Sequence, residues 1–444
     1  MLDMFKVSSR PQAILAVIAV LVVVGGAFVL NPTLLGHLAG PGPQQVVAWG
    51  DNAHGQLGTG TASRDLAAPA ATLAQVEDIV QLAAGSNHGL ALDRQGRVWS
   101  WGDNHYGQTA TDVSTDSRPS PQIVAGLPRI TRIAANQDHS AAVAADGTVW
   151  AWGLNISGQI GTGTNTPFEA QPKQVKDISD VKDVAAGYRT VLALKHDGSL
   201  WAWGGDCGLE KGSQSLRATV AELATEGSYA DDSAQTGKSE NRVFLVPQED
   251  CINEDVVGVK SLRPKLIEGL PKLTAISAGF GHMLAIDESR QVWAWGCNSF
   301  GQVGNGTVGP GTGANRKPAK VAGLDNIESV SAGFRHSIAR RSDGSLWAWG
   351  FNNSGSLGTG QIEDQNPLPA KIEGISNVTR ISAGHDYTLA VTRDGRVWAW
   401  GTRQAGQYEG DDSSRLVPRT AWNLTKATNV IAGGGFALAL VDRP

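Results

Sequence analysis

The stretch "VWAWG" at residues 397–401 decides the fold, because near-copies of it recur along the chain. The glycines that close the seven copies are Gly50, Gly102, Gly153, Gly204, Gly296, Gly350 and Gly401. Their spacing is about 51 residues, interrupted once by about 41 additional residues. A repeat period of this length is typical of a propeller, in which each repeat forms one blade.

Each repeat has the pattern of several short strands. In the unit at residues 130–153, apolar residues alternate on both sides of Asp146-Gly147, which indicates a β-hairpin. The same turn dipeptide recurs at Asp197-Gly198, Asp343-Gly344 and Asp394-Gly395. A charged content of only 18 % and 55 glycines also favour a turn-rich all-β fold. We therefore predict seven blades of four strands each.

The tryptophans of the repeat are predicted to build the scaffold. Thirteen of the 14 lie in this motif, and Trp422 is the exception. Two tryptophans that are two positions apart in a strand point to the same face, where they can fill the space between neighbouring blades. Full burial of one large apolar side chain is worth about 1.5–3 kcal/mol. The motif therefore indicates architecture and no chemistry.

The two ends of the repeat array predict how the ring closes. The first "WG", at Gly50, has no repeat strand before it, and the last strand, at residues 431–440, has no "WG" after it. We predict that these two segments pair, which leaves no long exposed sheet edge. Residues 46–444 would then form one closed propeller.

Several motifs resemble the repeat family named after the regulator of chromosome condensation. They are "AGSNHGLAL", "AGFGHMLAI", "AGFRHSIAR", the Asp-Gly turn, "WAWG" and "N..GQLG.G", within residues 46–441. The resemblance implies a seven-bladed propeller and a habit of binding proteins. The family includes an exchange factor for a Ran-type small GTPase and secreted bacterial propellers that inhibit enzymes. We expect a membrane-anchored member of bacterial type, although a fold does not determine a function.

The N-terminus carries an apolar run at residues 13–30 without any charged side chain. A helix of this length rises about 27 Å, close to the thickness of a bilayer core. Lys6 and Arg10 precede the run, which places residues 1–12 in the cytoplasm. We predict a transmembrane signal anchor, a linker at residues 31–45 and a propeller outside the cytoplasm. A cleaved signal peptide is the alternative, while the lack of amphipathic periodicity disfavours a buried core helix.

The break in the repeat is an acidic insertion at about residues 205–262. From Asp206 to Asp255 the chain has 11 acidic and 4 basic residues. The segment is either a solvated excursion or an arm specific to a partner. Cys207 and Cys251 bracket it, and we predict a disulfide between them because thiols oxidise outside the cytoplasm. Pairing of either cysteine with Cys297 remains open.

Four histidines share one repeat position without forming a predicted metal site. They are His88, His139, His282 and His336. Thr190, Tyr387 and Phe436 occupy the equivalent positions, so we predict structural hydrogen bonding in place of metal ligation. The "GNGTVG" sequence at residues 304–309 matches a dinucleotide motif, but Pro310 follows it and no helix begins there. With no catalytic constellation outside the repeats, we predict no enzyme activity, metal or cofactor.

The two residues after each Ala-Gly vary between repeats and are predicted to form a protein-binding face. Tyrosine, arginine and other large side chains at such positions are typical of binding hot spots. The predicted face comprises Asn87, Asp138, Tyr188, Arg189, Phe280, Phe334, Arg335, His385 and Asp386. Random drift at exposed positions is the alternative explanation.

Together these patterns predict a non-enzymatic, monomeric protein-binding scaffold displayed at the cell membrane. The net charge of −5 and the lack of a Lys/Arg block disfavour nucleic-acid binding. The sequence does not identify the partner. Alternative functions are a secreted enzyme inhibitor, which cleavage of the N-terminal run would favour, and an exchange factor, which the family resemblance suggests.

Overall fold

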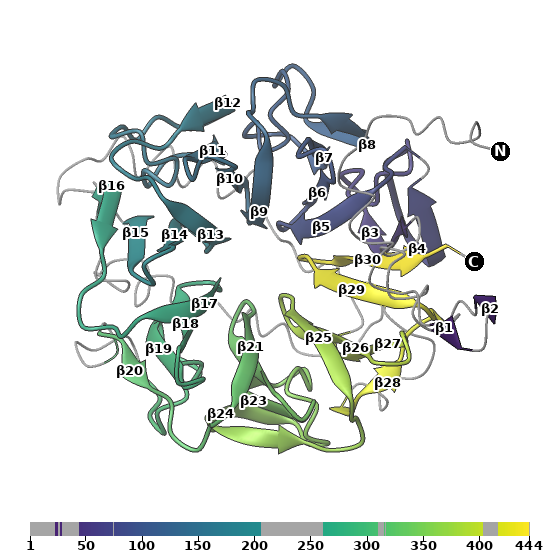
Figure 1. Ribbon diagram of the computed structural model, residues 1–444, viewed down its shortest axis with the longest axis vertical. Coiled ribbons are helices and arrows are strands. Elements are labelled where there is room, and N and C mark those ends of the chain that lie inside the picture. The colour runs from purple at the N-terminus through teal and green to yellow at the C-terminus, as the bar shows by residue number, and fades with distance from the viewer. Residues whose placement is uncertain are drawn as a thin grey trace, which may run out of the picture.

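The computed structural model describes residues 44–73, 75–205, 261–309, 315, 317–402 and 416–443, together with Val23–Val24 and Ala27–Phe28. Seven four-stranded antiparallel sheets surround a central axis (Figure 1). The predicted all-β, seven-bladed propeller is therefore confirmed.

In every blade the four strands follow one another from the central axis to the rim, and each blade is named here by its innermost strand. The innermost strands are β5 (Ile79–Ala84), β9 (Ile130–Asn136), β13 (Val181–Ala186), β17 (Leu273–Ala278), β21 (Ile327–Ala332), β25 (Val378–Ala383) and β29 (Ala427–Ala432). The second strands are β6 (His88–Asp93), β10 (His139–Ala144), β14 (Thr190–Lys195), β18 (His282–Asp287), β22 (His336–Arg341), β26 (Tyr387–Thr392) and β30 (Phe436–Asp442). The third strands, which carry the tryptophan motif, are β7 (Val98–Asp103), β11 (Val149–Leu154), β15 (Leu200–Gly204), β19 (Val292–Gly296), β23 (Leu346–Asn352), β27 (Val397–Gly401) and β3 (Gln44–Asn52). The outer strands are β8 (Ser117–Ile123), β12 (Phe168–Gln174), β16 (Ser261–Leu266), β20 (Ala319–Lys320), β24 (Glu363–Ile372), β28 (Arg419–Thr420) and β4 (Ser63–Leu73).

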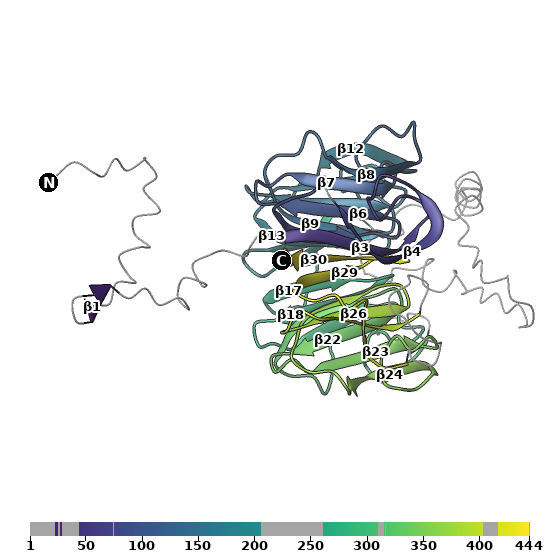
Figure 2. The same cartoon turned by 90° about the vertical axis from the view of Figure 1, so that its right-hand side faces the viewer.

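The ring closes through strands from both ends of the repeat array. β3 pairs antiparallel with β30, in a register that runs from Gln44 opposite Asp442 to Gly50 opposite Phe436. The β29 blade thus has the order β29, β30, β3, β4, and these strands lie together in the side view (Figure 2). The predicted closure is confirmed.

The glycine of each "WG" is required by a close contact at the end of the third strand. Gly102 has a φ of 101°, and a Cβ at this position would lie 2.4 Å from the carbonyl oxygen of Asn87. Any side chain would therefore clash with the loop between the first and second strands of the same blade. That contact brings the loop after the "WG" and the loop after the Ala-Gly to one face of the ring, which we call the mouth face.

Six of the seven motifs have two tryptophans, and the two differ in burial. The second one is fully buried: Trp101, for example, donates from Nε1 to the carbonyl oxygen of Gln56 in the preceding blade at 2.9 Å. The first is half-buried near the hairpin turn, where Trp99 lies 5.7 Å from the Arg97 guanidinium. The prediction that the motif fills the junction between blades is confirmed: the second tryptophan is buried in it, and the first is partly buried and packs against the same core.

Part of the apolar N-terminal run differs from the predicted helix. Val23–Val24 (β1) and Ala27–Phe28 (β2) pair as a short antiparallel sheet, and valine and phenylalanine are residues that favour strands. The other residues of 13–30 lie outside the described residues. Within the described part of the chain, no helix has the length and apolarity needed to span a membrane.

Candidate protein-binding face at the channel mouth

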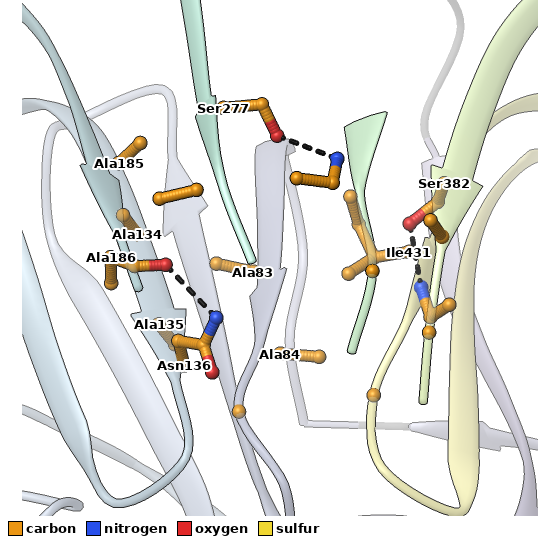
Figure 3. A pocket seen from close by; sticks show the side chains of 18 of the residues that line it. Ala83, Ala84, Ala134, Ala135, Asn136, Ala185, Ala186, Ser277, Ser382 and Ile431 are labelled. Atoms are coloured by element: carbon orange, nitrogen blue, oxygen red, sulfur yellow. Dashed lines mark hydrogen bonds between the residues drawn. The ribbon is translucent and has the colours of Figure 1, made fainter. Parts of the chain in front are cut away.

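The innermost strands surround a central cavity of about 250 Å³. Alanines of β5, β9 and β13 line much of it, and small polar side chains connect neighbouring blades across it (Figure 3). Ser277 Oγ accepts a hydrogen bond from the backbone N–H of Ala332 at 3.0 Å, and Ser382 Oγ accepts one from Ala432 at 2.9 Å. These bonds hold the blades in a fixed position around the channel.

The Ala-Gly pair that follows the innermost strand is not present in every blade. Asn136 occupies the glycine position in the β9 blade, and its Nδ2 donates to the carbonyl oxygen of Ala186 at 3.0 Å (Figure 3). A side-chain amide therefore connects this blade to the next at a position where the other blades have glycine.

Backbone hydrogen bonds align the loops that follow the innermost strands. The N–H groups of Tyr188, Phe280 and Phe334 donate to the carbonyl oxygens of Gly279, Gly333 and Gly384 at 3.1, 3.3 and 3.0 Å. Each bond joins one blade to the next. The side chains that follow the Ala-Gly pairs of neighbouring blades consequently lie side by side at the mouth of the channel.

Four of these side chains form a continuous stack, which we call the aromatic arc: Tyr188, Phe280, Phe334 and His385. The ring centroids are 4.0 Å apart from Tyr188 to Phe280, 4.0 Å from Phe280 to Phe334 and 4.7 Å from Phe334 to His385. All four side chains are half-buried. Burial lowers the pKa of His385, so its ring is neutral at neutral pH.

Two arginines extend the arc. The Arg189 guanidinium lies 5.0 Å from the Tyr188 ring, and that of Arg335 lies 5.2 Å from the Phe334 ring. Arg335 also forms an ion pair with Asp386 at 3.3 Å. Seven of the nine predicted binding residues are thus brought together by direct contacts.

Sequence reasoning missed two residues of this surface. Phe300 lies in the loop after the "WG" of β19, 5.2 Å from the Arg335 guanidinium, and Phe351 directly follows the "WG" in β23, 4.0 Å from it. Aromatic residues just after the tryptophan motif were the signal that could have identified them.

The other two predicted residues lie on the polar side of the mouth. Asn87 Oδ1 accepts from Gln56 Nε2 at 3.4 Å, while Asp138 lies in the β9 blade near Asp103. Burial, and to a smaller extent the Asp103 carboxylate, raise the pKa of Asp138 to about 7. Burial also raises the pKa of Asp103. The mouth therefore has an aromatic, arginine-containing side and an acidic side.

The profile of the RCC1-like domain matches residues 45–439. This chain belongs to the RCC1-like domain family. It is 30 % identical over 84 % of its length to the ultraviolet-B receptor UVR8 of Arabidopsis thaliana, of which the match covers 77 %. It is 28 % identical over 90 % of its length to the regulator of chromosome condensation of Mus musculus, of which the match covers 91 %.

Among solved structures, this RCC1-like propeller resembles Prp20p of Saccharomyces cerevisiae. The TM-score is 0.72 at 23 % identity, over 91 % of this chain and 92 % of the other, and this likeness shows the fold alone. The relatives named here are eukaryotic. Membership of a membrane-anchored bacterial-type subgroup stays a prediction.

The repeated histidines of the RCC1-like propeller are buried between blades. The Nε2 atoms of His88, His282 and His336 are hydrogen-bonded at 3.0, 3.0 and 2.9 Å to hydroxyls of the next blade. The hydroxyls belong to Ser140, Ser337 and Thr388, respectively. The predicted structural role is confirmed for these three. In the described ranges no group of three His, Cys, Asp or Glu residues could hold a metal ion.

The acidic insertion of this RCC1-like domain begins and ends at the mouth face. Gly205 donates to the carbonyl oxygen of Arg189 at 2.8 Å, and Ser261 pairs with Gly204. Cys207 and Cys251 lie outside the described residues, so their disulfide stays a prediction. Cys297 is buried beside Gly281 on the same face.

Proposed function

We propose that this protein is a non-enzymatic scaffold that binds a partner protein with the mouth face of its propeller, displayed outside the cytoplasm on a single-pass anchor. The aromatic arc is the observation that carries the proposal. It offers four half-buried rings from four consecutive blades, flanked by two arginines. Tyrosine and arginine are enriched among residues that dominate binding energy, and large apolar side chains give contact area.

The closing strand supports a display function for this face. β3 begins at Gln44 opposite Asp442, on the face of the ring that is opposite the mouth face. It reaches the mouth face at Gly50, opposite Phe436. A membrane anchor within residues 13–30 would therefore connect to the side opposite the aromatic arc. The arc would face away from the membrane, toward partners in the surrounding space.

Replacing Phe280 or Phe334 with alanine is expected to weaken capture of the partner by about thirtyfold. Each ring is packed against a neighbouring ring of the arc, and loss of such an anchor commonly costs about 2 kcal/mol of binding. The measurement is quantitative affinity capture from membranes with Phe280→Ala and Phe334→Ala, after the partner of the unchanged protein has been identified by mass spectrometry. The free energy of unfolding should fall by only about 1 kcal/mol.

Phe168→Ala is the matched control, because Phe168 is a 37 % exposed phenylalanine on the outer strand β12. Its capture should equal that of the unchanged protein. Unchanged capture by both arc variants, with loss in the control, would move the binding site from the mouth to the rim.

The proposed anchor predicts that protease added to intact spheroplasts removes the propeller, while the segment at residues 1–12 is protected. The apolar run at residues 13–30 and the preceding Lys6 and Arg10 are the basis of this expectation. Permeabilised cells provide the control, in which both parts become accessible. Protection of the propeller in intact spheroplasts, or a mature N-terminus after the apolar run, would overturn the uncleaved anchor.

An exchange-factor function is the second candidate, favoured by the 28 % identity that spans 90 % of this chain and 91 % of the regulator of chromosome condensation. It predicts faster release of labelled GDP from a purified Ran-type GTPase when the protein is added. The scaffold function predicts an unchanged release rate.

A further inference from the structure

Half-buried tryptophans surround the face of the propeller that is opposite the mouth face. We call it the turn face, because the turns between the second and third strands form it. The first tryptophan of the motif is the second residue of its strand, close to such a turn, in six blades, while Val47 occupies this position in β3. The six residues, each at a different junction between blades, are Trp99, Trp150, Trp201, Trp293, Trp347 and Trp398.

Trp422 supplies the tryptophan of the seventh junction from a different place in the repeat. It follows β28 and packs against the core cluster that contains Val47. The N–H of Ala421 donates to the carbonyl oxygen of Val397, the first residue of β27, at 2.8 Å, so Trp422 lies at the turn face. The φ of Trp422 is 53°, a left-handed conformation that is unfavourable for a bulky side chain. Despite this strain, all seven junctions have an indole, and we call the seven residues the tryptophan ring.

Exposed aliphatic side chains accompany the ring. Val80, the second residue of β5, is 45 % exposed. Ile123 and Leu266 are 46 and 47 % exposed, and they pair across neighbouring strands with Trp99 and Trp201. Apolar side chains that gather on one exposed face indicate a surface for a protein or a membrane.

The charged groups of the turn face favour a membrane. The cationic groups of Arg97, Lys195 and Arg341 lie 5.7, 5.6 and 5.3 Å from the centres of ring indoles. Tryptophan is enriched at membrane–water interfaces, where long cationic side chains extend to the lipid phosphates. The Asp-Gly turns add exposed carboxylates to the same face, so contact with lipid would depend on the indoles more than on net charge.

The chain also enters the propeller on this face. β3 begins there, at Gln44 opposite Asp442. Residues 31–43 separate the apolar run from β3, and a fully extended segment of this length spans at most about 45 Å. An anchor at residues 13–30 would therefore keep the turn face close to the bilayer.

We propose that the turn face rests on the membrane surface, with the tryptophan ring at the level of the lipid headgroups. This inference rests on the proposed membrane-anchored scaffold, and it adds a phospholipid bilayer as the partner of a second surface. Contact at the turn face fixes the orientation of the propeller, so that the aromatic arc points away from the membrane.

The test is the tryptophan fluorescence of the purified full chain in phosphatidylcholine vesicles whose acyl chains carry bromine near the headgroup. Bromine quenches indoles that touch the lipid. All 14 tryptophans follow residue 48, so the anchor contributes no signal. Seven of them are fully buried and the other seven form the ring, so we expect quenching of at most half of the emission relative to unbrominated vesicles.

Variants locate the contact on the turn face. The double variant Val80→Asp/Ile123→Asp places two charges there at exposed positions and should reduce the quenching while the melting temperature is unchanged. Trp422→Phe should lower the quenched emission and leave the unquenched emission unchanged. The matched control is Ile362→Asp/Leu368→Asp, at residues 63 and 51 % exposed near the mouth-face end of β24, and it should be quenched normally.

Equal emission from brominated and unbrominated vesicles overturns the membrane contact, and so does unchanged quenching of Val80→Asp/Ile123→Asp. Flotation of the vesicles separates this inference from the function on which it rests. A chain that floats with the vesicles without being quenched retains its anchor and refutes the contact alone. A chain that neither floats nor is quenched refutes both. Quenching together with unchanged partner capture by Phe280→Ala and Phe334→Ala would support the membrane contact and refute binding at the aromatic arc.

Discussion

A chain that lacks residues 427–444 is expected not to unfold cooperatively at all. The deletion removes β29 and β30, and with them the pairing of β30 to the whole length of β3 from Gln44 to Gly50. Phe436, Leu438 and Leu440 are at most 3 % exposed. Their burial alone contributes roughly 1.5–3 kcal/mol each, against a total stability of about 5–15 kcal/mol for a typical domain.

The measurement is a thermal melt followed by circular dichroism, combined with size-exclusion chromatography. The control is a chain that lacks only residues 443–444. Arg443 forms an exposed ion pair with Glu77 at 3.1 Å, and such pairs contribute about 0–1 kcal/mol. If the larger deletion melted as sharply and at the same temperature as the control, closure by β3 and β30 would contribute nothing to the fold.

The fold could be predicted from the sequence because its causes are local and repeated. The Asp146-Gly147 turn and the "WG" glycines are demanded by backbone geometry within one blade, so each copy carries the same signal. Closure could be predicted as well, since the two unmatched segments are at the ends of the repeat array. The unequal burial of Trp99 and Trp101 could not, because it depends on the position of the neighbouring blade.

The candidate site could be predicted in part. The variable pairs identified the positions, and the consecutive large residues Tyr188, Phe280 and Phe334 indicated a contiguous surface. The stacking distances and the role of Phe351 depend on how the side chains of neighbouring loops pack. Such contacts join residues about one repeat apart, and no short-range pattern records them.

Acidification from pH 7 to pH 5 is expected to destabilise the propeller by about 5 kcal/mol. Burial lowers the pKa of five histidines below the ordinary value of 6.5: His385 and the four at the shared repeat position. The pKa is lowered to about 3 for His88 and His282, and to about 4 for His139 and His336. In the unfolded chain these groups take up protons as the pH falls below about 6.5, while in the folded chain they stay neutral.

The sign follows from this difference in proton uptake. Because the unfolded state binds more protons in this range, stability is fully present above about pH 6.5 and is lost as the pH falls toward 4. Asp138 acts in the opposite direction, since its raised pKa of about 7 makes the folded state take up one proton first. Burial also raises the pKa of Asp103 and of Asp183, so five histidines act against three carboxyls. The histidines leave a net loss of stability, at about 1.4 kcal/mol per pH unit and proton.

His139 allows the contribution of one histidine to be isolated. Its ring nitrogens have no hydrogen-bond partner of normal geometry, because Val191 occupies the place where the neighbours of His88, His282 and His336 carry a hydroxyl. His139→Gln should therefore change stability at pH 7 by only about 1 kcal/mol. Between pH 6.5 and 5, urea titrations should show a pH dependence reduced by about one proton relative to the unchanged protein. If the two proteins lost stability in parallel over this range, or if neither lost any, buried neutral histidines would not be the cause of acid sensitivity.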